Sequence, residues 1–101
     1  MIVSADLPFR MTVLEVFGII GRGTVAAGRI ESGTLRVGDE IEILHISGGR
    51  QRTVVTGVEL ISQVLAPTEA TVGVLLKDVS RSDLKRGDVL TGVSAEVTRR
   101  T

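Results

Sequence analysis

Carboxylates and a histidine near the middle of the chain are the first groups that could do chemistry. Asp39, Glu40 and Glu42 lie close together, and His45 follows them as the single histidine of the chain. Paired carboxylates can act as general acid and base, and a histidine can activate a nucleophile. However, Glu40 and Glu42 alternate with isoleucines, which is typical of the hydrated side of a strand. We therefore interpret the carboxylates as the solvent-facing side of a strand, and His45 as a residue at the surface or the rim of the fold.

A glycine-rich segment, 18–23, is the second candidate, because backbone N–H groups of glycine-rich loops can hold phosphates. The phosphate loop of nucleotide-hydrolysing proteins has the form G-x-x-x-x-G-K-[ST] and opens a helix. This segment has no lysine and leads into residues that favour a strand. The chain also has no cysteine, and one histidine cannot by itself build a zinc site. We therefore expect no catalytic activity, no cofactor and no metal.

Composition limits the partners that the chain can attract. The 101 residues contain 12 Lys+Arg and 12 Asp+Glu, so the formal net charge is zero and any RNA contact must be local. The aromatic residues are Phe9 and Phe17, and the pattern predicts both in buried strand positions. No apolar run is long enough to span a bilayer, and no secretion signal is recognisable. We expect a single cytoplasmic domain over residues 1–101, with a core at about 7–93, and no membrane partner.

Short runs of β-branched residues separated by glycines dominate the chain. The expected strands are 10–17, 24–31, 40–46, 71–77 and 89–93. Residues 51–65 are expected to form one long strand with a bulge near Gly57, or two short strands broken there. One short helical turn is expected near Ser82 to Arg86. Short strands with many glycines favour a closed barrel, because closure removes exposed edges. The sequence therefore predicts an all-β fold, a closed six- or seven-stranded antiparallel β-barrel.

Residues 35–41 weakly resemble residues 84–90 in sequence, and we call this internal repeat the echo. Both segments place a basic residue, then glycine and aspartate, before a strand. We interpret the echo as a shared turn, in which glycine adopts a positive φ and aspartate bonds the following backbone. A duplicated ancestral half stays open as the alternative.

Nearly the whole chain, from about Leu7 to Leu90, carries an ordered series of motifs that resembles the second domain of elongation factor Tu and of related translational GTPases. The motifs are EVF at 15–17, GRGTV at 21–25, GRIESG at 28–33, VGDEIEI at 37–43, TGVEL at 56–60, VGVLL at 72–76 and RGDVL at 86–90. The resemblance implies a β-barrel of the translation-protein type that follows a GTP-binding domain, rearranges on nucleotide hydrolysis and helps hold the aminoacyl end of tRNA. In related factors this domain touches the ribosome.

The resemblance also implies where RNA would be contacted. Glu15 and Phe17 match the family's pocket for the amino acid, and Glu59 and Leu60 match the surroundings of the terminal adenosine. Arginines could meet phosphates on one rim of the barrel. These arginines are Arg22, Arg29, Arg50 and Arg52. The candidate RNA-contact residues are Glu15, Phe17, Arg22, Arg29, Glu59 and Leu60.

Three positions depart from the family pattern. Leu14 replaces an acidic residue, Ala27 a threonine and Thr71 an asparagine. Each lost hydrogen bond is worth roughly 0.5–3 kcal/mol, so we expect only weak binding of tRNA or ribosomal RNA. The expected partners are such an RNA, and a GTPase domain or another protein. One alternative function stays open, a protein-interaction barrel that no longer acts in translation. The origin of the chain is also open: it is either an independent protein, which Met1 and the neat termini favour, or an excised domain of a larger GTPase.

Overall fold

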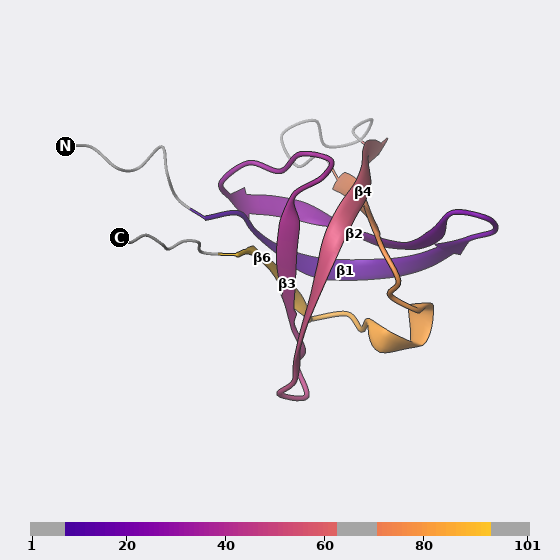
Figure 1. Cartoon of the computed structure of the whole chain (residues 1–101). Helices are drawn as coiled ribbons and strands as arrows, with labels where there is room; N and C mark the ends of the chain where they lie inside the picture. Colours follow the sequence, from indigo (N-terminus) through magenta and orange to yellow (C-terminus); the bar gives the residue numbers. More distant parts are fainter. Residues whose placement is uncertain (1–7, 63–70, 94–101) are drawn as a thin grey trace.

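The computed structural model describes residues 8–62 and 71–93 (Figure 1). These residues form six strands and one turn of 3₁₀ helix, η3 (Arg81–Asp83). The strands are β1 (Arg10–Ile19), β2 (Gly23–Ser32), β3 (Glu40–Leu44), β4 (Arg50–Ser62), β5 (Thr71–Leu76) and β6 (Val89–Gly92). The expected part of β4 beyond Ser62 and the two chain ends lie outside the described residues.

The strands close into a barrel in the order β1-β2-β5-β4-β3-β6, and every neighbouring pair is antiparallel. This confirms the all-β closed barrel, with six strands. The bulge expected near Gly57 is present, because the register between β4 and β5 shifts between Val55 and Gly57. At Gly28 of β2 the backbone lies close to that of β1, since a Cβ there would collide with the carbonyl oxygen of Thr12.

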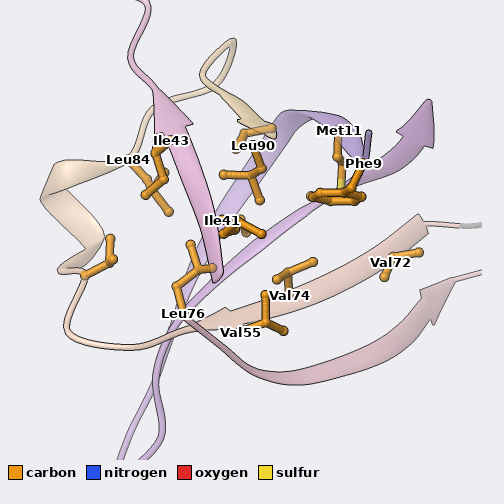
Figure 2. Packing of buried hydrophobic residues seen from close by; sticks show 13 residues of the cluster. Phe9, Met11, Ile41, Ile43, Val55, Val72, Val74, Leu76, Leu84 and Leu90 are labelled. Atoms are coloured by element: carbon orange, nitrogen blue, oxygen red, sulfur yellow. The ribbon is translucent and has the colours of Figure 1, made fainter. Parts of the chain in front are cut away.

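Alternating residues fill the barrel interior. Ile41 and Ile43 of β3 are buried, whereas Glu40 and Glu42, which alternate with them, face outward. The side chains of Met11, Val13 and Leu90 are also fully buried. Figure 2 shows apolar side chains from several strands converging in this core. Fully burying one such side chain contributes about 1.5–3 kcal/mol, so barrel closure is stabilised mainly from inside.

An approximate two-fold symmetry relates β1, β2 and β3 to β4, β5 and β6. Exchanging the two sets leaves the order of strands around the barrel unchanged. The pairing register follows the same symmetry: Val13 pairs with Gly28, and its counterpart Val55 pairs with Leu76. A register shift follows Val13 in β1 and Val55 in β4. The two halves therefore correspond residue by residue, as a duplicated half would require.

The echo seen in the sequence consists of two turns related by this symmetry. Gly38 and Gly87 have φ values of 97° and 99°, which confirms the expected positive φ. Gly38 N donates to the carbonyl of Val55 at 2.8 Å, and Gly87 N donates to that of Val13 at 2.9 Å. Each turn thus fastens the start of one strand to the opposite half of the barrel.

The aspartates of these turns were expected to form hydrogen bonds with later residues, and this prediction was wrong. In the described part of the chain, neither Asp39 nor Asp88 bonds the backbone that follows it in its turn. Their carboxylates accept the backbone N–H three residues earlier, from Arg36 at 2.9 Å and from Lys85 at 3.0 Å. This contact closes the turn on itself, because the carboxylate satisfies an N–H group that the turn leaves without a backbone partner.

Two further expectations need correction. The helical turn comprises Arg81–Asp83 and not the residues near Ser82 to Arg86, because Lys85 already belongs to the Asp88 turn. Phe9 is buried as expected, but Phe17 is 37% exposed. The register shift after Val13 places Phe17 on the outer face of β1.

Candidate functional site

A row of four residues runs across the outer face of β1, β2, β5 and β4. Glu15 pairs with Ala27, Ala27 pairs with Gly73, and Gly73 pairs with Glu59. The two glutamates end this row, and two very small residues lie between them. Three strand spacings separate the ends, which is roughly 14 Å. Barrel closure therefore brings Glu15 and Glu59 onto one surface although they are distant in sequence.

An apolar row lies beside this acidic one. Phe17 pairs with Val25, Val25 with Leu75, and Leu75 with Gly57. Val25 and Leu75 face away from the interior, since the next residues along their strands, Ala26 and Val74, lie in the core. Both are nevertheless almost fully buried, at 4% and 3% exposed.

The glycine at the end of the apolar row shows how the row is packed. A Cβ at Gly57 would lie 3.2 Å from Cδ1 of Leu75, so the leucine side chain leans over the bulge of β4. The packed Leu75 fills the floor of the outer face, and Phe17 stands exposed at the far end of the row, beyond Val25. We call this surface, made of the acidic and the apolar row, the four-strand face.

An ion pair crosses the four-strand face. Arg22, in the turn between β1 and β2, has Nη2 3.7 Å from Oε2 of Glu59 on β4. Both side chains are more than half exposed, so the pair contributes at most about 1 kcal/mol to stability. The effect of the ion pair is to place the Arg22 guanidinium beside Glu59, at one end of the acidic row.

The other candidate residues lie around this face. Arg29 is exposed on β2, opposite Thr12, and about 20 Å along the strand direction from Arg22. Leu60 pairs with Val72, and its side chain lies outside the described part of the chain. The structure thus brings Glu15, Phe17, Arg22 and Glu59 to one surface and places Arg29 farther along it. Arg50 stands on another hairpin, where Nη1 is 3.9 Å from Oε1 of Glu42.

The three positions that depart from the family pattern border the same surface. Ala27 forms part of the acidic row and is 2% exposed. Leu14 is half-buried at the register shift of β1, and Thr71 opens β5 opposite Ser62. The floor beneath the two glutamates therefore lacks a side-chain hydroxyl at Ala27.

A polar cluster on another part of the barrel could not be found from the sequence. Asp88 is 1% exposed, and its carboxylate accepts the backbone N–H groups of Lys85 and Ile46 at 3.0 and 2.9 Å. His45 Nδ1 lies 3.0 Å from the same carboxylate, and His45 Nε2 lies 3.3 Å from Oε1 of Gln51. The echo identified Asp88 as a turn residue, but no local signal connects it to His45.

The charged and polar groups of this cluster stabilise the turn before β6. Burial by itself would raise the pKa of Asp88, but the N–H groups of Ile46 and Lys85, with His45, outweigh it and hold the pKa below its usual value. The hydrogen bonds of the His45 ring among the described residues go to Gln51 and to the Asp88 carboxylate, which also accepts two backbone N–H groups. The half-buried His45 therefore orients the turn.

Two kinds of feature are absent from the described residues. No group of three or more His, Cys, Asp or Glu residues there is arranged to hold a metal ion. Residues 8–62 and 71–93 also contain no helix that is long and apolar enough to cross a membrane.

Comparison with known families agrees with this architecture. The family model for elongation factor Tu domain 2 matches residues 23–91, from the first residue of β2 into β6. The match covers more than half of the chain, including the two symmetry-related turns and Glu59. The six-stranded barrel and this match show that the chain belongs to the elongation factor Tu domain 2 family.

Proposed function

We propose that the chain is a non-catalytic module of the translation-factor type that contacts the aminoacyl end of tRNA through the four-strand face and works together with a GTPase domain. The observation that carries the proposal is the pairing of Glu15, Ala27, Gly73 and Glu59 in one row beside Phe17. Family membership supports the choice of ligand.

The chemistry of the face suits the end of an RNA chain. Carboxylates such as those of Glu15 and Glu59 accept hydrogen bonds from ribose hydroxyls. The exposed ring of Phe17 offers a surface on which a base or an apolar amino-acid side chain can stack. Arg22 supplies a cation for a phosphate next to these groups. Because Ala27 offers no hydroxyl and the net charge is zero, we expect a dissociation constant no tighter than about 10⁻⁴–10⁻⁶ M.

The test is a titration of the ¹⁵N-labelled chain with aminoacylated tRNA, followed by NMR. We expect shift changes at Glu15, Phe17, Ala27 and Glu59, and none at the Asp88 turn. F17A should weaken binding about fivefold or more, because stacking on one base is worth about 1–3 kcal/mol. The matched control, E42Q, removes a carboxylate from β3 and should leave affinity unchanged.

The arginines give an independent measurement. If Arg22 and Arg29 meet phosphates, each replacement by alanine should reduce the slope of log affinity against log salt by about 0.7–0.9. Absence of salt-dependent binding, or shift changes confined to another surface, would contradict the proposal.

A second function is favoured by one observation, the apolar tip of the β1–β2 hairpin. Ile20 is fully exposed and Ile19 and Phe17 are more than one-third exposed, which is unusual for neighbouring large apolar residues. A barrel that has left translation could bind a protein there. Retention of a defined protein partner by R22A and R29A, with its loss in I20S, would favour this alternative.

A further inference from the structure

The turn at the tip of the β1–β2 hairpin presents an isoleucine to solvent. Ile20 is fully exposed, and Arg22 N donates to the carbonyl of Ile19 at 2.9 Å to close the turn. A Cβ at Gly21 would have no neighbour within 4 Å, so the described part of the chain leaves this turn uncovered. In Figure 1 the hairpin reaches past the other strands to its tip. A large apolar side chain that projects in this way marks an interaction surface.

A cation stands beside this isoleucine. The side chain of Arg22 is 53% exposed, and its Nη2 lies 3.7 Å from Oε2 of Glu59. An exposed ion pair is weak, so the guanidinium can exchange Glu59 for another carboxylate at little cost. The tip therefore offers one aliphatic side chain and one positive charge, two residues apart.

A pocket of complementary character adjoins the start of β1. Its lining includes the apolar side chains of Phe9, Leu35 and Ile41, and the carboxylates of Asp39 and Glu40. We call it the Asp39 pocket. Its volume is about 270 Å³, and because a cavity of about 150 Å³ already binds benzene, it has room for one isoleucine side chain. The exposed Glu40 makes no ion pair with any other residue of 8–62 and 71–93, so its charge is available to a partner.

The tip and the Asp39 pocket belong to opposite ends of the β1–β2 hairpin. Phe9 of the pocket directly precedes β1, and the turn with Ile20 directly follows it. The 10 residues of β1 span roughly 33 Å, so the tip cannot reach the pocket of its own molecule. A second copy of this chain carries the tip that matches. Contact between two different surfaces of identical molecules is heterologous, and it leaves a free tip and a free pocket at the two ends of an assembly.

We propose that Ile20 of one copy enters the Asp39 pocket of the next, and that Arg22 exchanges Glu59 for Glu40 at the edge of that pocket. Copies of the chain then associate head to tail. One side chain and one ion pair bury less than the roughly 1,200–2,000 Å² of a stable interface. The association is therefore reversible and increases with protein concentration.

Sedimentation equilibrium of the full 101-residue chain at increasing concentrations tests the apolar part of this contact. We expect the weight-average mass to rise with concentration. I20S should weaken the association about tenfold or more, the factor that corresponds to burial of one isoleucine. The matched control is I46S, which removes an isoleucine that is 68% exposed and lies outside both surfaces. It should associate as the unsubstituted chain does.

Two charge reversals test whether the tip meets the pocket. R22E and E40K should each stay largely monomeric where the unsubstituted chain associates, and circular dichroism should show that both retain the barrel. Their equimolar mixture should form 1:1 pairs, because E40K keeps an intact tip and R22E an intact pocket.

Three results would each overturn the proposal. They are an unsubstituted chain that is monomeric at every concentration, an association that survives I20S, and a mixture of R22E with E40K that does not pair. Contact of one tip with another tip would let E40K associate normally, and this outcome would also contradict it.

Discussion

The turn before β6 and the turn before β3 have the same backbone but different surroundings. Asp39 N donates to the carbonyl of Arg36 at 3.1 Å, and Asp88 N donates to that of Lys85 at 3.0 Å. The surroundings differ because Asp88 is buried and also holds His45 and Ile46, whereas Asp39 is half-buried. The comparison teaches that a short motif encodes the turn, while the tertiary structure decides how much stability depends on it.

Replacing the two aspartates should give the largest difference between the turns. D88A leaves two backbone N–H groups and His45 without the buried carboxylate that accepts from them, so we expect a loss of about 3–5 kcal/mol in the free energy of unfolding. D39A should cost only about 1 kcal/mol. Urea unfolding of both variants measures this, and equal losses would show that burial does not distinguish the turns.

The histidine that only one turn possesses should have the next largest effect. H45A removes the ring that contacts the Asp88 carboxylate, and we expect a loss of about 2 kcal/mol. H45N can place an amide N–H where Nδ1 lies and should recover part of this loss. If H45A and H45N are equally destabilised, packing of the ring and not its hydrogen bond fixes the turn.

The glycines should reveal how alike the two backbones are. G38A and G87A each force alanine into a positive φ, which costs about 1–2 kcal/mol. At Gly87 the added methyl group also meets Cδ1 of Ile46, but that exposed side chain can turn away. We therefore expect the two melting temperatures to fall by similar amounts, and a much larger fall for G87A would mean that Ile46 is held rigidly.

The pH dependence of stability at the Asp88 turn should show the smallest effect. The pKa of Asp88 is lowered in the folded chain, so its contribution is complete above the ordinary carboxyl pKa of about 3.9 and is lost as the pH falls below that value. The slope cannot exceed about 1.4 kcal/mol per pH unit for one proton. Urea unfolding between pH 6 and 3 should show a shallower acid loss for D88N than for the unsubstituted chain, and parallel curves would contradict the assignment.

The candidate site was predictable in part. Glu15, Phe17 and Glu59 could be named because their motifs are local and resemble a known family. Their common surface depends on the pairing of β2 with β5, which the motifs do not contain. The ion pair of Arg22 with Glu59 depends on the same closure. Phe17 was expected inside because an aromatic in a strand favours burial, and the register shift in β1 reversed its face.

The sequence by itself determined the local structure of this protein. Alternating β-branched residues specified the strands, and glycines followed by aspartates specified two equivalent turns, because φ preferences and side-chain alternation act over a few residues. The tertiary structure alone decided that His45 meets Asp88 and that Glu15 and Glu59 share a row. These contacts join residues far apart in the chain, and their geometry follows from strand order, register and barrel closure, which depend on how the whole core packs.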